Sequence, residues 1–529
     1  MVVIIIGGSC MGSQSSDKFT SKVSLNMVTN VVRTVLMAVI GLLMVPYYIG
    51  EFGLAAYAIL PLATSLTSYF ISIADSLSSV FTRYLVIALQ KDDSEDANRV
   101  FSTTVIGMSG MMMVLVPIAL AISIASPYIF NIGPAAALDV QLLFLMVITS
   151  SLIVSYGSCI TSVFMAYNEL YITYSGRIVH VVSQTVFVIL FFVLFGPSLT
   201  MVGFSYILSV LLYVAIILHH FRKMDVGLKL SRGYYNGALL KEMGALGIWA
   251  VIAELGALLF IQASLILVNL SLGSEIQGSF SIVANVISMV NTACASIAVT
   301  ATPLVYHSYS EGDRKKMLQT LKLFSKFVGV ILAFPMAFLL VFSPQVLEMW
   351  LGEGFNNLIP MLYLMIPAQI AVCTTYPLLQ VPVLYKKVRK MAFLTLFIGL
   401  SNVVVALLLL TLTNWGVYGV GLAWTITTLV LRVVVYPLYS SHLIGISTLE
   451  LMKPLVWSYM MFIISLIICY GISVIVQIPA TWFAVISSLL IVFIIYVLTS
   501  MKLIFNKSER EETLSYFPGP VRNIIKKVL

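Results

Sequence analysis

Long apolar segments recur along the whole chain and set the strongest limit on its fold. Of the 529 residues, 60% are hydrophobic and 9% are charged, and the mean hydropathy is +1.04. Runs of about 18 to 25 apolar residues cross about 30 Å of hydrocarbon as helices. The alternating segments of about ten residues that mark a membrane barrel are absent. We therefore predict an all-α polytopic membrane protein with fourteen transmembrane helices, near 23–46, 54–88, 101–126, 138–166, 171–195, 201–221, 244–270, 279–305, 322–342, 358–385, 391–411, 418–441, 454–476 and 481–503.

One short pattern occurs in both halves of the chain, each time between two apolar segments. Residues 48–57 align with residues 271–280, which places Gly50 on Gly273 at an offset of 223. Related halves are common in secondary transporters, whose substrate site lies between the halves. An even number of helices in each half gives both halves the same orientation in the membrane. The predicted organisation is a cytoplasmic N-terminal tail (1–22), an N-lobe of six helices (23–221), a cytoplasmic inter-lobe loop (222–243), a C-lobe of six helices (244–441), two further helices (454–503) and a basic cytoplasmic tail (504–529).

Positive charge is confined to alternate loops. None of the 29 Lys and Arg residues falls in the loops near 47–53, 127–137, 196–200, 271–278, 343–357, 412–417 and 477–480. This asymmetry predicts that these loops are external and that both termini are cytoplasmic, in a multi-pass protein of the cell membrane. The net charge of +8 is therefore a topology signal and gives no reason to expect a nucleic-acid partner. The residues around Met11 resemble an ordinary start, so residues 1–10 are expected to be dispensable.

Polar side chains form stripes on three of the predicted helices. Each stripe repeats at helical spacing, so its members share one face. Such groups normally face a bundle interior or a water-filled cavity. We expect them to line a cleft between the lobes, although Ser, Thr and Asn also hold membrane helices together, and that reading stays open. The residues are Asn26, Asn30 and Arg33 on the first helix, Ser68, Ser72 and Asp75 on the second, and Asn285, Ser288 and Thr292 on the eighth.

Glu254 and Arg33 each lie about ten residues into a predicted helix, roughly 15 Å from the inner surface. Opposite charges at matched depth predict an inter-lobe ion pair that breaks when the transporter changes state. The alternatives are a structural role for Glu254 and an ion site formed by Asp75 or Glu254. Arg177 and Arg432 lie nearer the predicted cytoplasmic helix ends, where snorkelling to the interface accounts for them.

Recognisable enzyme and cofactor motifs are missing. The chain has no phosphate-binding loop of the Walker type, no zinc-ligand spacing and no nucleophile elbow. Its five cysteines are scattered and suit packing. The longest predicted outer loop has about fifteen residues, too few for the external domain that a polysaccharide polymerase or ligase needs. We therefore expect no enzyme activity, no cofactor and no metal.

Several short motifs resemble the polysaccharide-exporting flippases, the O-antigen and capsule branch of the multidrug/oligosaccharidyl-lipid/polysaccharide (MOP) superfamily. The first is the helix 1–2 junction, and the second is Ala74-Asp75-Ser76-Leu77 followed by Thr82-Arg83-Tyr84. This chain departs from the family where Ser76 and Leu77 replace the usual glycine. The second half matches at Leu272-Gly273-x-Glu275-x-x-Gly278-x-Phe280-Ser281 and at Pro303.

The resemblance implies two six-helix lobes in a V-shaped, alternating-access arrangement and a lipid-linked, pyrophosphate-bearing oligosaccharide as substrate. It further implies membrane lipids and glycan-assembly proteins as partners, and we expect a monomer. Arg33 is then expected to neutralise phosphate, and the polar stripes to bind sugar hydroxyls. The alternative from the same superfamily is a cation-coupled multidrug efflux antiporter of the MATE type.

Overall fold

The computed structural model describes residues 13–90, 94–224, 226–475, 481–504 and 509, and the described part is helical with no strand. Thirteen spans in it, each a single helix or a run of consecutive helical elements, are long and apolar enough to cross a membrane, and they fall on the first thirteen predicted segments. The fourteenth segment coincides with helix α19 (Trp482–Leu503), which is not among those thirteen. The prediction of an all-α polytopic membrane protein is confirmed.

The chain forms two compact units. The N-terminal unit contains the described residues up to Ile282 together with Ala392–Val417, and the C-terminal unit contains Val283–Met391 and the described residues from Tyr418 onward. The predicted seventh and eleventh helices, α9 and α15, therefore belong by their contacts to the N-terminal unit. The functional division into lobes at residues 222–243 stays a prediction.

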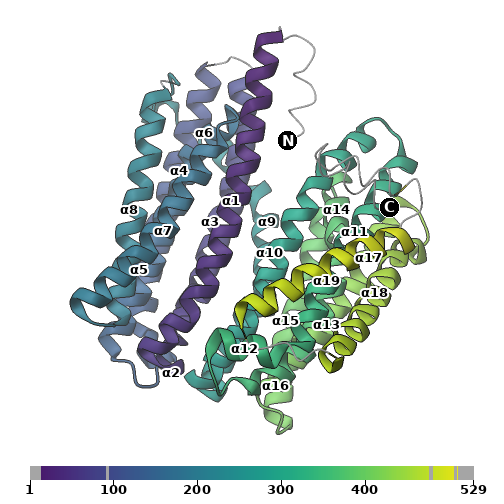
Figure 1. Cartoon of the computed structure of the whole chain (residues 1–529). Helices are drawn as coiled ribbons and strands as arrows, with labels where there is room; N and C mark the ends of the chain where they lie inside the picture. The colour runs from purple at the N-terminus through teal and green to yellow at the C-terminus, as the bar shows by residue number, and fades with distance from the viewer. Residues whose placement is uncertain (1–12, 91–93, 225, 476–480, 505–508, 510–529) are drawn as a thin grey trace. The chain divides into compact units, whose positions relative to one another are not determined.

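In the N-terminal unit the helices are α1 (Ser13–Phe52), α2 (Leu54–Tyr57), α3 (Ile59–Gln90), α4 (Ser94–Ile129), α5 (Ala137–Tyr156), α6 (Ser158–Ala166), α7 (Leu170–Phe195), α8 (Leu199–Met224), η3 (Arg232–Tyr234), α9 (Gly237–Leu272), the first turns of α10 (Ser274–Ser310), and α15 (Val388–Leu412). Helix α7 lies between α1 and α8, and α3 packs on α5, α6 and α9 (Figure 1).

The remaining helices form the C-terminal unit, which also holds most of α10. They are α11 (Arg314–Val341), α12 (Ser343–Leu351), η4 (Asn356–Leu358), α13 (Ile359–Thr375), η5 (Tyr376–Leu379), α14 (Gln380–Leu384), α16 (Val417–Leu429), η6 (Val430–Val435), α17 (Tyr436–Ile444), α18 (Thr448–Ile475) and α19. The tenth segment is interrupted by the η5 turn at Pro377. Proline removes a backbone donor, which favours such a break.

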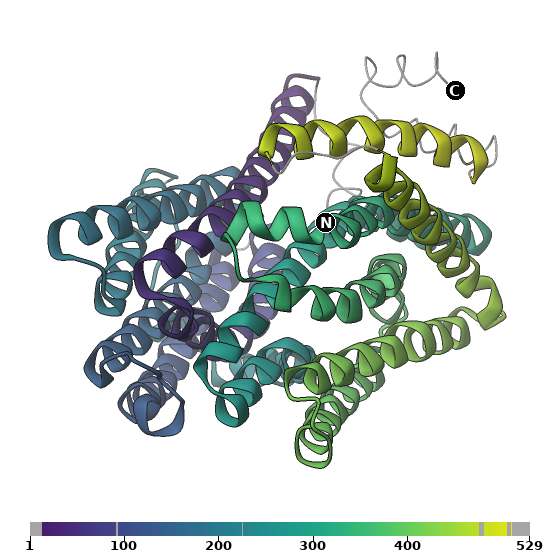
Figure 2. The same cartoon turned by 60° about the horizontal axis from the view of Figure 1, so that its bottom comes forward.

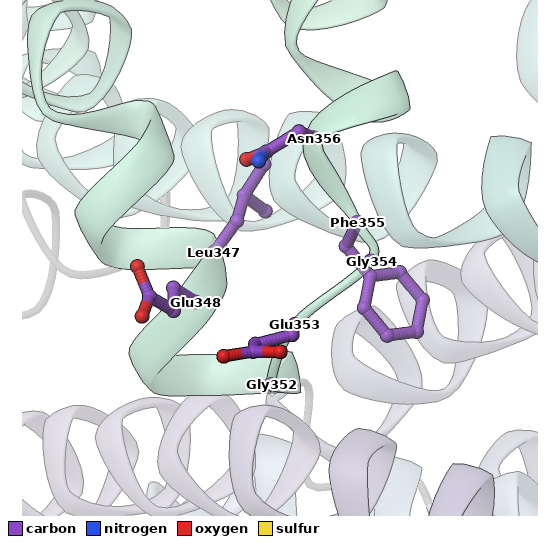
Figure 3. A pocket seen from close by; sticks show the side chains of 7 residues that line it. All are labelled: Leu347, Glu348, Gly352, Glu353, Gly354, Phe355 and Asn356. Carbon is purple, nitrogen blue, oxygen red and sulfur yellow. The ribbon is translucent and has the colours of Figure 1, made fainter.

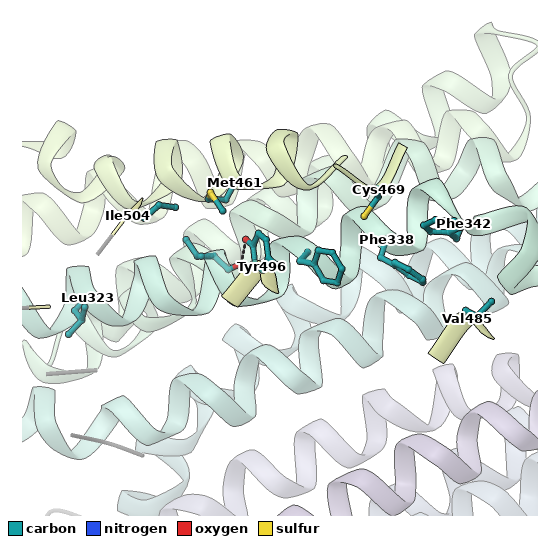
Figure 4. Packing of buried hydrophobic residues seen from close by; sticks show 10 residues of the cluster. Leu323, Phe338, Phe342, Met461, Cys469, Val485, Tyr496 and Ile504 are labelled. Atoms are coloured by element: carbon teal, nitrogen blue, oxygen red, sulfur yellow. Dashed lines mark hydrogen bonds between the residues drawn. The ribbon is translucent and has the colours of Figure 1, made fainter. Parts of the chain in front are cut away.

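The two C-terminal helices pack on α11 in the C-terminal unit (Figures 1 and 2). Their shared core contains Phe338, Met461 and Tyr496, and the Tyr496 hydroxyl donates a hydrogen bond to the carbonyl of Val330 at 2.7 Å (Figure 4). Lys326 is buried beside this core, and its Nζ donates to the Ile504 carbonyl at 2.7 Å and to Glu509 at 2.8 Å. A buried ammonium group is stable there because these acceptors replace its water.

The internal repeat is present, but its register differs from the one that the sequence pattern predicts. The glycine that ends the first helix of each half with a positive φ is Gly53 (+75°) in one case and Gly273 (+89°) in the other. Both conformations suit glycine because it has no Cβ. Gly50 lies inside α1 instead. The structural offset at this junction is therefore 220 residues, and the predicted match of Gly50 with Gly273 is wrong.

A hydrogen bond between the fourth and the sixth membrane-spanning segment occurs at equivalent positions in both halves of the chain. Thr200 of α8 donates to Asp139 of α5 at 2.6 Å, and Thr425 of α16 donates to the carbonyl of Leu364 of α13 at 3.1 Å. Each pair spans 61 residues, and the two pairs are 225 residues apart. The two halves thus share one way of packing their fourth helix on their sixth.

Candidate functional site

Asn26 is a structural residue in this structure. Its Nδ2 donates to the carbonyl of Asn168 at 3.1 Å and to its Oδ1 at 2.9 Å, while its Oδ1 accepts from the backbone N–H of Tyr171 at 2.6 Å. One helical turn earlier, Lys22 forms an ion pair with Glu169 at 2.6 Å. These contacts tie α1 to the turn that begins α7, so the predicted substrate role of Asn26 finds no support in its geometry.

Asn26→Ala should lower the stability of the N-terminal unit. The substitution removes the buried Asn26 side chain and leaves the half-buried groups of Asn168 and Tyr171 without their partner, which costs about 1–3 kcal/mol. We expect a lower thermal unfolding midpoint for the purified protein in detergent. Thr29→Ala is the matched control, because its exposed hydroxyl bonds only to the Leu25 carbonyl of the same helix. Equal midpoints for the two variants would contradict the structural role.

Arg33 presents its guanidinium from α1 toward α7. Its Nε and Nη2 donate to Oδ1 of Asn30 at 3.2 and 2.9 Å, and its Cζ lies 5.4 Å from the centre of the Tyr174 ring. Asn30 therefore orients the arginine, and the ring holds it by a cation–π contact. The guanidinium is half-buried and forms no ion pair within the described residues.

Arg177 forms a second cationic centre beside it, on the same helix as Tyr174 and three residues later. Its Cζ lies 5.2 Å from the centre of the Tyr213 ring of α8, and the His180 ring lies 6.0 Å from the same tyrosine. The charges of Arg33 and Arg177 act on each other. The interfacial position predicted for Arg177 stays a prediction, and the structure adds the cation–π contact with Tyr213. In the sequence, the three-residue spacing of Tyr174 and Arg177 indicates that both side chains lie on one face of a helix.

Asp75 lies on α3, where a row of polar contacts joins this helix to α5 and α6. Its Oδ1 accepts from Oγ of Ser155 at 3.3 Å. Two further rungs follow at the same separation of 80 residues, Ser78–Ser158 at 2.6 Å and Thr82–Ser162 at 2.5 Å. The hydroxyls of this row hold parallel helices together. Asp75 differs from the others because its side chain is exposed and lies within range of the Arg177 charge.

Glu254 belongs to α9, which packs along α3 in the N-terminal unit. It forms no ion pair with Arg33 among the described residues, and the charge that acts on it is that of Asp75. Both members of the predicted pair lie in one compact unit, and the inter-lobe ion pair stays a prediction.

The predicted serines and the polar stripe of α10 have separate surroundings. Ser68 is half-buried, and its hydroxyl donates a hydrogen bond to the Thr64 carbonyl of the same helix at 2.9 Å. Ser72, one turn later, is also half-buried. Asn285, Ser288 and Thr292 lie on α10 in the C-terminal unit, where Thr292 donates to the Ser288 carbonyl at 2.8 Å. Ser288 and Thr292 are exposed. Their meeting with Arg33 across a cleft stays a prediction.

A cavity of about 310 Å³ lies in the C-terminal unit at the end of α12. Figure 3 shows Glu348 on the helix, Glu353 on the loop, and Phe355 and Asn356 on the segment that leads to η4. The two carboxylates make this pocket acidic. Across the described residues, no group of three or more His, Cys, Asp or Glu side chains is placed to hold a metal ion.

Comparison with known proteins shows the fold. No family model matches the chain. The uncharacterized membrane protein EpsK of Bacillus subtilis (strain 168) is 25% identical over 505 residues, which are 94% of this chain and 98% of that protein. The structure is similar to the inward-facing conformation of a multidrug resistance MATE family transporter of the MOP superfamily, with a TM-score of 0.63 and 14% identity over 79% of this chain and 98% of that chain.

The outward-facing conformation of a MATE family transporter gives a TM-score of 0.59 and 15% identity, over 80% of this chain and 95% of that chain. The chain therefore has the fold of MATE transporters and is a multi-pass membrane protein.

Proposed function

We propose that this chain is a membrane transporter that moves a lipid-linked, pyrophosphate-bearing oligosaccharide across the cytoplasmic membrane by alternating access. The proposal takes its general class from the MATE-type fold and its substrate class from the sequence resemblance to the polysaccharide-exporting flippases, and the arginines of the N-terminal unit support an anionic head group. The positive charge of alternate loops supports cytoplasmic termini. The substrate presents an anionic head that must cross hydrocarbon while its lipid tail stays in the bilayer.

One observation carries the choice of an anionic substrate. Arg33 and Arg177 lie in membrane-spanning helices, interact with each other and rest on tyrosine rings without an ion pair in the described residues. Guanidinium groups in such surroundings offer forked donors that match phosphate oxygens. Charges in a membrane helix are costly and normally serve a function. Two adjacent cations also repel the cationic drugs of many efflux pumps.

The alternative is a cation-coupled efflux antiporter, and one observation favours it. Asp75 and Glu254 lie within electrostatic range of each other in the same unit, and neither forms an ion pair among the described residues. Two neighbouring carboxylates in membrane helices suit a proton or sodium ion. The same pair also suits a flippase that is driven by an ion gradient, so it does not by itself separate the two functions.

A gene-replacement experiment separates the two functions in the native cell. We expect deletion to remove a surface glycan or to accumulate its lipid-linked precursor on the inner leaflet, while drug susceptibility stays unchanged. Plasmid-borne wild-type chain should restore the glycan. Higher drug susceptibility with normal surface glycan would overturn the flippase and favour the antiporter.

A further inference from the structure

The inter-lobe loop is held on the N-terminal unit by hydrogen bonds to α4. The backbone N–H of Lys229 donates to Oδ1 of Asn98 at 2.6 Å, and Oγ of Ser102 donates to the Lys229 carbonyl at 3.1 Å. The same Oγ accepts from the backbone N–H of Ser231 at 3.2 Å. Asn98 and Ser102 are buried, and buried polar side chains of this kind are normally hydrogen-bonded. The loop is therefore a fixed part of this unit's surface.

Apolar contacts bring the end of α8, the loop and the start of α9 to one place. Four partly buried side chains pack against one cluster of buried residues on α3, α4 and α6, and they are Phe221, Val226, Leu228 and Leu239. The η3 turn of the loop also packs on α4. These contacts lie at the end of the N-terminal unit where α4 begins and α8 ends, the upper end in Figure 1. The charged residues next to these four side chains in sequence therefore share one surface.

Five basic side chains are exposed at this end of the unit. We call them the basic surface, and they are Arg222, Lys223, Lys229, Arg232 and Lys241. None of the five forms an ion pair within the described residues. Two carboxylates of the same end are engaged elsewhere, since Glu242 accepts from the Tyr84 hydroxyl at 2.7 Å and Glu95 pairs with Arg99 at 3.2 Å. The basic surface therefore favours an anionic partner.

The basic surface lies at the boundary of two membrane spans. One span ends with α8 at Met224, and the next begins with α9 at Gly237. Between them the side chains of Leu230 and Tyr235 are exposed. Tyrosine and apolar side chains beside lysine and arginine are typical of positions at the level of lipid head groups. This combination fits a membrane surface better than it fits a soluble partner.

We propose that the basic surface binds the anionic phospholipid head groups of the leaflet beside it. Each lysine or arginine near an anionic membrane surface strengthens the attraction about fivefold, so several together select anionic over zwitterionic lipid. Because α4 already holds the loop in place, little conformational freedom is lost on binding. This interaction does not depend on which substrate the chain transports.

Local hydrogen exchange of the purified full chain in detergent tests the proposal. Phosphatidylglycerol or phosphatidylcholine is added in increasing mole fraction, and the exchange of residues 226–241 is followed by mass spectrometry. Phosphatidylglycerol should protect these residues at a lower mole fraction than phosphatidylcholine, and added salt should reduce the difference because it screens charge. Neutralising four of the charges should reduce the preference at least about tenfold. That variant carries Arg222→Gln, Lys223→Gln, Lys229→Gln and Arg232→Gln.

A matched variant removes four exposed charges from the C-terminal unit and should keep the preference at residues 226–241. It carries Lys386→Gln, Lys387→Gln, Arg389→Gln and Lys390→Gln. The proposal is overturned if the first variant keeps the preference or if both variants lose it equally. Should the first variant fail to fold, the wild-type chain still decides, because equal protection by the two lipids or a preference insensitive to salt also overturns the proposal. Protection by a polyglutamate peptide but not by phosphatidylglycerol would assign the surface to an acidic protein instead.

Discussion

Replacing Arg33 and Arg177 together by alanine should abolish transport of the lipid-linked glycan, and each single replacement should weaken it about tenfold to a hundredfold. A charge-assisted contact to phosphate contributes about 1.5–3 kcal/mol, which sets the size of the single effects. Arg33→Lys and Arg177→Lys should keep part of the activity, because lysine retains the charge but loses the forked donors. The measurement is surface glycan per copy of membrane-inserted protein.

Protein abundance decides how a loss of glycan is interpreted. Arg33 also bonds to Asn30 and rests on Tyr174, so a variant can fail by misfolding. Arg99→Ala is the matched control, since this arginine is exposed and pairs with Glu95 one turn earlier on α4. Normal abundance with normal surface glycan in the double variant would remove both arginines from the substrate site. If abundance falls and Glu254→Gln restores it, Arg33 has a structural role.

Gly256→Val should prevent the N-terminal unit from folding. A Cβ at Gly256 would lie 2.6 Å from the backbone nitrogen of Leu396 and 2.7 Å from its Cα. A Cβ at the facing Gly399 would lie 2.5 Å from the carbonyl oxygen of Gly256. Helices α9 and α15 therefore approach through glycines, and backbone atoms cannot move aside as a side chain can. We expect loss of the folded fraction by size-exclusion chromatography in detergent.

Gly244→Ala is the control on the same helix, because nothing lies within 4 Å of its added Cβ. Alanine also has the higher helix propensity, so this variant should be as stable as the parent or slightly more stable. A monodisperse Gly256→Val protein with a normal unfolding midpoint would show that α9 and α15 are not packed this closely.

The helical spans were predictable from the sequence because the thickness of the hydrocarbon sets their length and composition. The repeat was predictable in kind but not in register at the helix 1–2 junction. Gly50 and Gly53 are both glycines in one short stretch, and only the positive φ identifies Gly53 as the residue that ends the helix. Residue identity alone does not carry that conformational difference.

The site was predictable only in part, since helical periodicity shows which residues share a face but not which helix covers that face. Asn26 and Arg33 share a face of α1, yet Asn26 fastens the start of α7 while Arg33 rests on Tyr174. Arg432 was assigned to the interface by counting along the helix. Its half-buried side chain lies in a π-helical segment, which helical periodicity does not predict.

Transport by the purified chain in proteoliposomes tests the central claim most directly. The substrate is a fluorescent polyprenyl-diphosphate oligosaccharide, and a membrane-impermeant quencher reports how much of it has changed leaflet. We predict translocation that requires the wild-type chain and is lost in the Arg33→Ala, Arg177→Ala double variant, which should still be folded by its unfolding midpoint. Equal leaflet exchange in liposomes that contain wild-type chain, double variant or no protein would contradict the proposed function.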